Sequence, residues 1–361
     1  MVNRDVADKD AAMKSMNRRE CLALMAASGA AISLPAAAAA PETDWAWLLG
    51  DWDVWHSRLK DRLVNSSEWQ EFAGKSSFWN TLGGLGNVDD NSLDLPGGVY
   101  RGLSVRAFDP KAGSWAIWWL DGRNPERIDP PVRGGFKGDE GEFIGTDIHK
   151  GTPVTVRFRW HEVRSKRPWW DQSFSTDGGK TWETNWRNYF TRKRSQASGL
   201  PRIENDPPEA RAWDFLAGQW KVRNRKLRKR LAGSRDWDEF DSTLTNWQVL
   251  GGRGNVGDNL FDGPGTPYRG MSLRAYNVEK REWLSWWVDA RSPANIGAPL
   301  RGRFLEGSAT LIGDDQHDGR PVKVRSQWTR TDGNSPHWEQ AYSTDGGQSW
   351  EINWVSDLIR V

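Results

Sequence analysis

The stretch that decides the fold runs from residue 100 to residue 121, where YRGLSVRAF is followed by DPKAG and then by SWAIWWLD. Apolar and polar residues alternate along its first part, which is the two-residue period of a strand with one buried face. Its last part is rich in aromatic residues, which favour strands, and the segment between contains Pro and Gly. The stretch therefore predicts two antiparallel strands joined by a tight turn.

The same pattern returns 168 residues further along the chain. Residues 45–186 align without a gap with residues 213–354, and 63 of the 142 paired positions are identical. The shared motifs include YRG at 100 and 268, GNV at 86 and 254, and WWxD at 118 and 286. Solenoids and propellers repeat every ~20–50 residues, so this spacing indicates two tandem copies of one domain.

Turns divide each copy into about nine or ten short strands. A meander of this size must protect its edge strands, and closure into a small up-and-down barrel does so economically. The predicted fold class is all-β, two tandem antiparallel lipocalin-like β-barrels of about nine or ten strands each, with a sandwich as the alternative. We predict barrels over 41–193 and 209–361, a linker over 194–208, and one helical turn, over 45–49, at the start of the first barrel.

Residues 1–40 resemble a twin-arginine export signal. Arg18 and Arg19 precede a short apolar run over 22–34, and the segment ends in Pro35 and five alanines. We predict a periplasmic or secreted protein, translated from Met1 or Met16. The single cysteine lies inside this segment. Cleavage near residue 40 would leave a chain without thiol catalysis, cysteine-bound zinc or iron–sulfur chemistry.

The composition excludes some classes of protein. The chain has 361 residues, with 50 basic and 48 acidic side chains and a net charge of +2. This balance argues against a dedicated nucleic-acid binder, and a mean hydropathy of −0.76 argues against an integral membrane protein. The 25 tryptophans are more than the cores of two small barrels need. We therefore expect an aromatic core, an interface between the barrels, and an aromatic-lined ligand pocket as the functional alternative.

A family resemblance rests on four stretches: LGGLGNVD at 82–89, LPGGVYRG at 95–102, WWLD at 118–121 and DGGKTWETNW at 177–186. With them, the unit resembles the DUF1579-like proteins, a bacterial family of unknown function. The openings WLLGDWDV at 47–54 and FLAGQWKV at 215–222 resemble calycin-type barrels, in which a short helix plugs the barrel. The resemblance implies a lipocalin-like barrel and supplies no catalytic residue.

Two short motifs have structural interpretations. Residues 175–182 match the Asp-box pattern SxDxGxTW, and 343–350 repeat it with one change; we expect hairpin turns held by the Asp side chain. Residues 252–257 fit GxGxxG, but Asp89 breaks the pattern in the first copy and no βαβ unit surrounds it. A tight turn or bulge is the better interpretation.

Neither the histidines nor the basic residues between Lys221 and Arg230 indicate a cofactor site. We see no inward-facing strand histidine that could hold a haem and no set of three metal ligands, so we predict neither cofactor nor metal. His149 and His317, the only aligned pair, are expected in solvated turns. Lys221 to Arg230 holds seven basic residues; we expect a solvated strand that guards a sheet edge, with weak contact to an anionic surface as the alternative.

The candidate site consists of residues that both copies share and that would need partners if they faced a barrel interior. They are Arg106, Trp119, Asp121, Arg123, Arg157, Gln172 and Asn185 in the first copy, and Arg274, Trp287, Asp289, Arg291, Arg325, Gln340 and Asn353 in the second.

Three functions are open at this point. The first is an exported binding protein that holds a small, partly apolar or aromatic ligand in a Trp-lined barrel. The second is a hydratase, isomerase or lyase acting on a hydrophobic substrate, with Asp121 or Asp289 as acid/base and Arg123 or Arg291 holding an anionic group. The third is a structural or partner-binding protein that uses aromatic strand surfaces.

Overall fold

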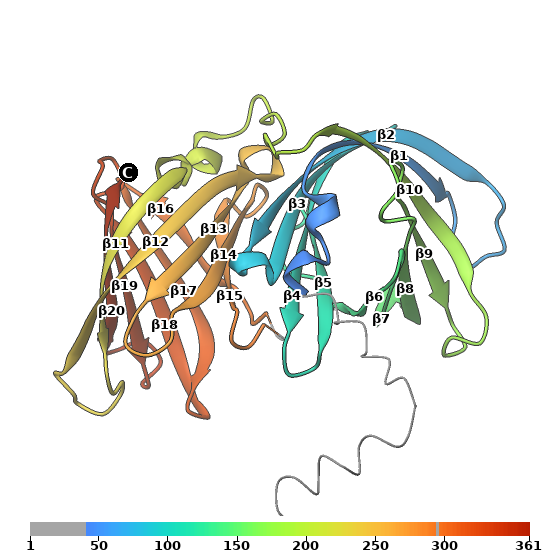
Figure 1. Ribbon diagram of the computed structural model, residues 1–361. Helices are drawn as coiled ribbons and strands as arrows, with labels where there is room; N and C mark the ends of the chain where they lie inside the picture. The colour runs from blue at the N-terminus through green and yellow to red at the C-terminus, as the bar shows by residue number, and fades with distance from the viewer. Residues whose placement is uncertain (1–40, 294–295) are drawn as a thin grey trace, which may run out of the picture. The chain divides into compact units, whose positions relative to one another are not determined.

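The computed structural model describes residues 41–293 and 296–361, and it contains two closed antiparallel barrels of ten strands each (Figure 1). The predicted fold class is confirmed. The predicted export signal lies outside the described residues. Barrel 1 contains β1 (Gly50–Leu59), β2 (Trp69–Thr81), β3 (Gly86–Leu95), β4 (Gly98–Asp109), β5 (Ser114–Asp121), β6 (Val132–Lys137), β7 (Glu140–His149), β8 (Thr152–His161), β9 (Trp169–Ser175) and β10 (Glu183–Arg194).

Barrel 2 repeats the same order. It contains β11 (Gly218–Leu227), β12 (Trp237–Val249), β13 (Gly254–Asp262), β14 (Tyr268–Asn277), β15 (Glu282–Asp289), β16 (Leu300–Leu305), β17 (Ser308–His317), β18 (Arg320–Thr329), β19 (His337–Ser343) and β20 (Glu351–Arg360). In both barrels every strand pairs with its neighbours in the chain, and the first strand also pairs with the last. Closure gives each of these twenty strands a paired neighbour on both sides, as the length of the meander predicts.

Helical structure among the described residues is confined to short 3₁₀ turns. They are η1 (Pro41–Thr43), η2 (Ala46–Leu48), η3 (Leu82–Gly84), η4 (Pro208–Arg211), η5 (Asp214–Leu216) and η6 (Leu250–Gly252). Within this part of the chain, no helix has the length and apolar character needed to span a membrane.

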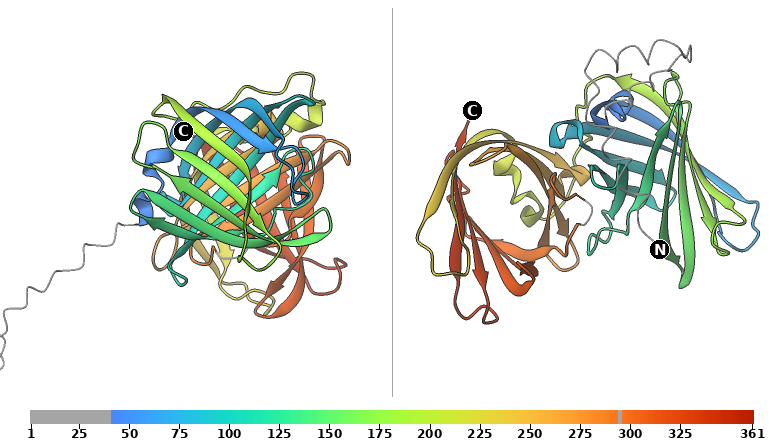
Figure 2. Two further views of the ribbon diagram at one scale, coloured as in Figure 1. Left: turned by 90° about the vertical axis from the view of Figure 1, so that its right-hand side faces the viewer. Right: turned by 60° about the horizontal axis from the view of Figure 1, so that its bottom comes forward.

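The turn before each first strand plugs one end of its barrel, which we call the floor. In barrel 1 the fully buried Trp45 packs among Trp115, Phe136 and Trp160, with ring centroids 4.7–6.0 Å apart. Trp213 occupies the same position in barrel 2, among Trp283, Phe304 and Trp328. The right-hand view of Figure 2 shows the short turns of barrel 2 within its ring of strands. The Trp52 indole, from the opening stretch WLLGDWDV, fixes the plug, because its Nε1 donates to the Leu48 carbonyl at 2.7 Å.

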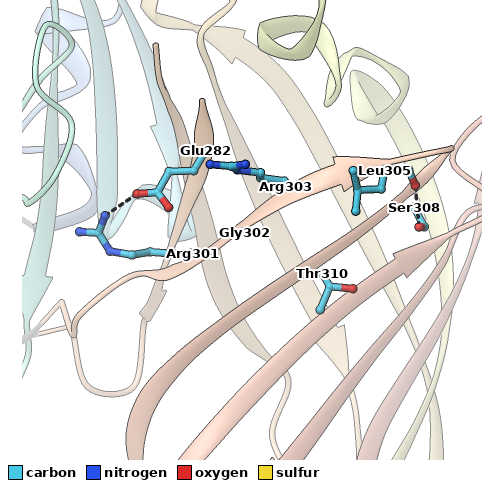
Figure 3. Close-up of a pocket in the computed structure, with 7 residues that line it drawn as sticks. All are labelled: Glu282, Arg301, Gly302, Arg303, Leu305, Ser308 and Thr310. Atoms are coloured by element: carbon cyan, nitrogen blue, oxygen red, sulfur yellow. Dashed lines mark hydrogen bonds and ion pairs between the residues drawn. The ribbon is translucent and has the colours of Figure 1, made fainter. Parts of the chain in front are cut away.

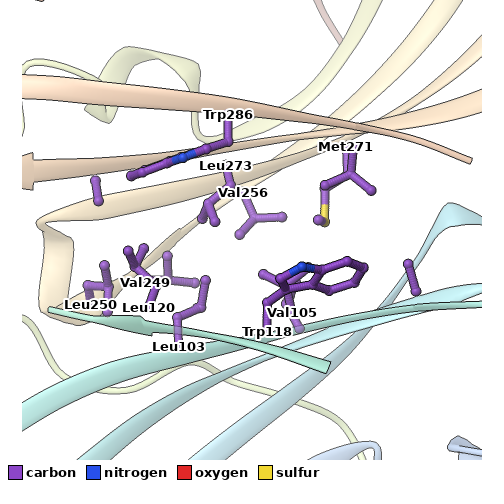
Figure 4. Close-up of a cluster of buried hydrophobic side chains, with 14 of the residues drawn as sticks. Leu103, Val105, Trp118, Leu120, Val249, Leu250, Val256, Met271, Leu273 and Trp286 are labelled. Atoms are coloured by element: carbon purple, nitrogen blue, oxygen red, sulfur yellow. The ribbon is translucent and has the colours of Figure 1, made fainter. Parts of the chain in front are cut away.

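The outer faces of β3–β5 and β13–β15 share one hydrophobic core (Figure 4). Trp118 and Leu103 from barrel 1 belong to the same buried cluster as Leu250, Met271 and Trp286 from barrel 2. Because side chains alternate along a strand, Trp118 faces this interface while Trp119 faces the barrel interior. The predicted interface between the barrels is confirmed, and it accounts for part of the tryptophan excess.

Two aspartates, Asp90, which is buried, and Asp258, which is partly buried, make this interface reciprocal. The carboxylate of Asp90 accepts the Leu250 backbone N–H at 3.0 Å, and that of Asp258 accepts the Leu82 N–H at 3.1 Å. Each bond joins one barrel to the turn of the other, as in a two-fold symmetric dimer interface. Burial raises the pKa of Asp90 to about 7, with nearby Asp89 adding to the rise and Arg101 opposing it.

The repeated turn over 82–84 explains the GxGxxG match. Gly83 and Gly84 have φ values of 70° and 99°, and Gly251 and Gly252 have 67° and 96°, so both turns use the left-handed backbone that glycine tolerates. The turn leads into a strand instead of a helix. The GxGxxG match at 252–257 therefore lies in a structural turn at the interface, as expected.

The Asp boxes are hairpin turns, as predicted. The Asp177 carboxylate accepts N–H bonds from residues 180 and 181 and hydroxyl bonds from Ser175 and Thr181, all within 3.0 Å. These bonds hold the pKa of Asp177 well below its usual range. Asp345 makes the same set of bonds in barrel 2. The Asp boxes therefore have a complete structural role.

Candidate ligand site inside the barrels

The interior of each barrel runs from the plugged floor to the opposite end, which we call the mouth. The strand registers place Trp119 and Arg106 on the inner wall of barrel 1, and Trp287 and Arg274 on that of barrel 2. The arginines lie at the floor, because Arg106 stacks over Trp45 and Arg274 over Trp213, with the guanidinium carbon 4.7 and 4.2 Å from the ring. Trp119 and Trp287 lie nearer the mouth, close to the ends of β5 and β15.

At the mouth of barrel 1, side chains from the YRG and WWxD motifs contact one another. The Trp119 indole lies against Gly102, where a Cβ atom would come within 2.2 Å of Cζ2. Its Nε1 donates to the Tyr100 hydroxyl at 2.9 Å. Arg123 lies over the Tyr100 ring and donates two hydrogen bonds to the Asp121 carboxylate at 2.6 and 3.0 Å. The YRG and WWxD motifs therefore meet here: the glycine seats the indole, and the tyrosine carries the arginine.

Barrel 2 has the same parts but a more open arrangement. Trp287 lies against Gly270 as Trp119 lies against Gly102. Tyr268, however, stacks on Phe261, which replaces Leu93 of barrel 1. The Trp287 side chain faces inward and is nevertheless 41% exposed. Solvent therefore reaches an aromatic surface on the inner wall of barrel 2.

Additional cations surround both mouths. In barrel 1, Arg58 and Arg62 each lie over the Trp186 ring, at 5.3 and 5.9 Å. In barrel 2, Lys226 takes the place of Arg58 and lies 3.9 Å from the Trp354 ring centroid. Burial lowers the pKa of Lys226 to about 8, and the charges of Arg230 and Arg291 lower it further. The mouth of barrel 2 thus combines aromatic faces with positive charges close enough to repel one another.

At the floor of barrel 1 the buried arginine has an acid partner. Arg106 Nη1 donates to the Asp89 carboxylate at 2.8 Å and to Asn87 Oδ1 at 2.9 Å. Asn91 Nδ2 donates to the other Asp89 oxygen at 2.7 Å, and the Ser76 hydroxyl donates to Asn91. Further hydrogen bonds therefore support this buried ion pair, although Arg106 Nε has no hydrogen-bond partner among the described residues.

The floor of barrel 2 keeps the arginine but not the acid. Arg274 is 7% exposed, and its Nη1 donates to Asn255 Oδ1 at 3.0 Å and Ser272 Oγ at 3.3 Å. The position of Asp89 is Gly257 in this copy. Across residues 41–293 and 296–361, no carboxylate forms an ion pair with Arg274. Burial lowers the pKa of Arg274 to about 9, and the group remains a cation at neutral pH.

Other candidate residues lie elsewhere. Gln172 donates to Asn185 at 2.8 Å, and Gln340 donates to Asn353 at 2.9 Å. These amide pairs lie at the register shift between the last two strands of each barrel, so they hold a bulge in place. Arg157 and Arg325 lie on the outer wall and stack on the Asp-box residues Trp182 and Trp350. The structure therefore divides the fourteen sequence candidates into mouth, floor, bulge and outer-wall groups.

Two expectations about basic and histidine residues are wrong. His56 is an inward-facing strand histidine, buried on β1, with Nδ1 2.6 Å from Asn188 Oδ1 and its ring stacked on Phe72. Burial lowers the pKa of His56 to about 4, so the ring is neutral at neutral pH. The basic strand β11 guards no edge, because it pairs with both β12 and β20. Lys226, at its end, turns toward the mouth.

The two aspartates considered as acid/base groups are engaged by arginine. Asp289 accepts two side-chain bonds and one backbone bond from Arg291, at 2.5–2.9 Å. Burial alone would raise the pKa of Asp289, but the hydrogen bonds and charge of Arg291 outweigh it and lower the pKa. Asp121 makes the same three contacts with Arg123. Both carboxylates are positioned to fix an arginine beside a tyrosine ring.

Two hollows lie on the outer walls. One, of about 340 Å³, is lined by residues of β15–β17 that include Glu282, Arg301 and Thr310, and Figure 3 shows the ion pair between Glu282 and Arg301. The other, of about 570 Å³, lies along β1, β2 and β10 beside Trp55 and Tyr189. Trp55 is 48% exposed. These hollows are separate from the barrel interiors.

Sequence reasoning missed several interior residues. Both copies share Tyr100, Trp186 and Asn255, and none of the three is among the sequence candidates. The clearest signal in the sequence was a difference between the two copies. Asp89 and Gly257 occupy the same position in the motif GNVxD, which is otherwise identical in both copies. The residue that breaks the GxGxxG pattern in the first copy is the acid that neutralises its buried arginine.

Comparison with known proteins gives distant structural likenesses only. No family model matches the chain, and no curated protein sequence does. An S-type phycobiliprotein lyase from Guillardia theta is 11% identical, covers 44% of this chain and 98% of its own, and gives a TM-score of 0.31. A DUF3598 protein of unknown function from Nostoc punctiforme is 12% identical, covers 89% and 99%, and gives 0.27. Kievitone hydratase from Nectria haematococca is 10% identical, covers 91% and 94%, and gives 0.15. These scores carry no argument about function.

Proposed function

We propose that this protein is a binding protein that holds a small, partly apolar molecule inside a barrel. The observation that carries the proposal is the 41% exposure of Trp287, a large aromatic side chain on an inner wall. Ligand sites combine apolar and aromatic walls with a few polar groups that orient the ligand. The mouth of barrel 2 offers both, because Lys226 and Arg291 stand beside Trp354 and Tyr268.

A neutral fluorescent probe tests this proposal. We expect N-phenyl-1-naphthylamine to bind the purified chain saturably and to increase in fluorescence as it leaves water. The W287S variant should bind at least fivefold more weakly. W119S is the matched control, because Trp119 is already engaged by Tyr100, and it should bind as the parent protein does. An absence of saturable binding, or equal binding by W287S and the parent, would refute the proposal.

We also propose export by the twin-arginine route and membership of the DUF1579-like family. The support for export is the arginine pair followed by a short apolar run, and the support for the family is the four repeated stretches of sequence. Changing Arg18 and Arg19 together to lysine should retain the chain in the cytoplasm. Unchanged export of that variant would contradict the proposed route.

The outer wall of barrel 1 favours a second candidate function, docking of a partner. Trp55, Tyr189, Trp169 and His161 are successive cross-strand neighbours over β1, β10, β9 and β8. Trp169 stacks on both Tyr189 and His161, at 6.0 and 3.8 Å. The corresponding row in barrel 2 is Arg223, Asp357, His337 and Thr329, which is polar. If this row docks a partner, W55S should weaken the association while probe binding inside the barrels stays unchanged.

A further inference from the structure

The two barrels differ in charge balance at the floor, and the difference points to a ligand. Both floors contain a buried arginine stacked on the plug tryptophan. In barrel 1 that arginine pairs with Asp89 at 2.8 Å, whereas in barrel 2 the same position is Gly257. Burying a cation without a counter-charge is costly, so an unpaired buried arginine calls for an anion from another source.

A second observation, independent of the missing acid, comes from two amides. Asn246 is 3% exposed, and both its Nδ2 and its Oδ1 are buried without a hydrogen-bond partner. Barrel 1 has Phe78 at that position, which needs no partner. Asn255 Nδ2 is buried and unpartnered as well. Buried polar atoms are normally hydrogen-bonded, so the cluster contains two amide donors that the chain itself leaves unsatisfied.

These groups surround the place where barrel 1 holds its carboxylate. A Cβ atom built on Gly257 would lie 2.7 Å from Ser272 Oγ, 2.9 Å from Asn246 Nδ2 and 3.0 Å from Leu244 Cδ1, so these side chains pack closely around the position of the missing acid. Ser272 and Asn255 also accept hydrogen bonds from Arg274. Arg274, Asn246, Asn255 and Ser272 therefore border one position, and three of the four carry N–H donors.

We propose that the floor of barrel 2 binds the oxyanion head group of an amphipathic organic anion, with Arg274 taking the charge and the amides of Asn246 and Asn255 donating to it. The head group stands where the Asp89 carboxylate stands in barrel 1. The proposal rests on the proposed function and adds the chemical class of the ligand.

The surroundings of Arg274 define the rest of the ligand. The inner wall from floor to mouth contains Trp338, Trp354 and Trp287, which suit a flat apolar body. Lys226 and Arg291 at the mouth attract an anion as it approaches. The carboxylate position of Asp129, near the mouth of barrel 1, is Gly297 in barrel 2. The interior of barrel 2 thus has a cation at the floor, aromatic side chains along the wall and cations at the mouth. An organic anion with an aromatic or otherwise apolar body fits this arrangement.

A matched pair of probes separates the charge from the body. 1-Anilinonaphthalene-8-sulfonate has the ring system of N-phenyl-1-naphthylamine with an added sulfonate. We expect the full chain to bind the anionic probe at least tenfold more tightly than the neutral one. The R274M variant should lose this preference and keep its affinity for the neutral probe within about twofold. Retained binding of the neutral probe shows that the variant is folded and its mouth is intact.

The sequence of barrel 1 supplies the second pair of variants. N246F/G257D gives barrel 2 the phenylalanine and the acid of barrel 1, which should occupy Arg274 and abolish the preference for the anionic probe. The reverse change, F78N/D89G, should give barrel 1 an unpaired arginine and add a second anion site per chain. Circular dichroism of each variant checks that the barrels are folded.

The outcomes distinguish the two proposals. If the neutral probe binds and the anionic one is not preferred, or if R274M keeps the preference, the anion site is refuted and the binding function stands. If neither probe binds saturably, both proposals fail. A preference lost in both R274M and N246F/G257D supports the anion site.

Discussion

Replacing Asp89 with Asn tests whether the acid at the floor of barrel 1 is what makes its buried arginine tolerable. Asp89 and Arg106 are both buried and lie 2.8 Å apart. Removing one partner of such a pair typically costs about 3–5 kcal/mol, because the other charge stays buried and uncompensated. Barrel 2 gives a second indication. Burial without a carboxylate partner lowers the pKa of Arg274 to about 9, so the interior of barrel 2 disfavours the charged form of this side chain.

The two arginines should then respond in opposite directions. R106M should destabilise the protein because it leaves Asp89 unpaired, whereas R274M should stabilise it by at least ~1 kcal/mol because it removes an unpaired charge. The double variant D89N/R106M should recover most of what either single change loses. Urea unfolding followed by far-ultraviolet circular dichroism measures all four variants. With a slope of about 1–3 kcal/mol per molar urea, a loss of about 3–5 kcal/mol should lower the unfolding midpoint of D89N by about 1–5 M.

Two results would refute this reasoning. The first is a loss below ~1 kcal/mol for D89N, which would mean that Arg106 has adequate solvation without the acid. The second is destabilisation by R274M comparable to that by R106M, which would mean that Arg274 is satisfied within the chain. Stabilisation by R274M together with loss of the anionic probe would show that the arginine is kept for binding and costs stability.

Three further predictions concern the interface and the wall of barrel 2. L250A removes a fully buried side chain from the shared core and should cost about 2–5 kcal/mol in urea unfolding; a loss below ~1 kcal/mol would contradict the interface. The folded-state pKa of Asp90, about 7, lies above its ordinary 3.8, so the folded state holds the proton more tightly. The contribution of Asp90 to stability should be greatest below about pH 4 and decline as the pH rises to about 7; the difference in unfolding free energy between the parent protein and D90N, measured by urea unfolding across this range, should follow that decline, and a constant difference would contradict it. G270A places a methyl group 2.2 Å from Trp287 Cζ2, so it should displace the indole, cost about 1–3 kcal/mol and weaken neutral-probe binding; unchanged binding would show that the indole has room to move.

Much of the fold could be predicted from the chain because the relevant physics is local. The two-residue period of 100–108 indicates a strand in any context, and the same period places Trp118 and Trp119 on opposite faces. Because the two copies align without a gap, they are expected to have the same fold. Closure into a barrel follows from the need to cover strand edges. The Asp-box turns follow from side-chain bonds that span only a few residues.

The candidate site could be predicted only in part, because its members are brought together across strands. Trp119 and Asp121 were found as repeated residues, but the seat that Gly102 provides for the indole depends on the register between β4 and β5. Arg157 was selected by the same criterion and lies on the outer wall. The inward position of His56 also depends on the closure of β1 against β10, a contact between residues 132 positions apart.

The sequence by itself determined the duplication, the strands, the turns and the set of polar residues that both copies share. These properties follow from spacing along the chain. Only the tertiary structure decided which of those residues have partners. Arg106 and Arg274 are identical in type and nearly so in context, yet one faces a carboxylate and the other faces unsatisfied amides. Whether a buried charge is compensated depends on atoms that neighbouring strands place within about 3 Å of it, and the fold alone fixes those distances.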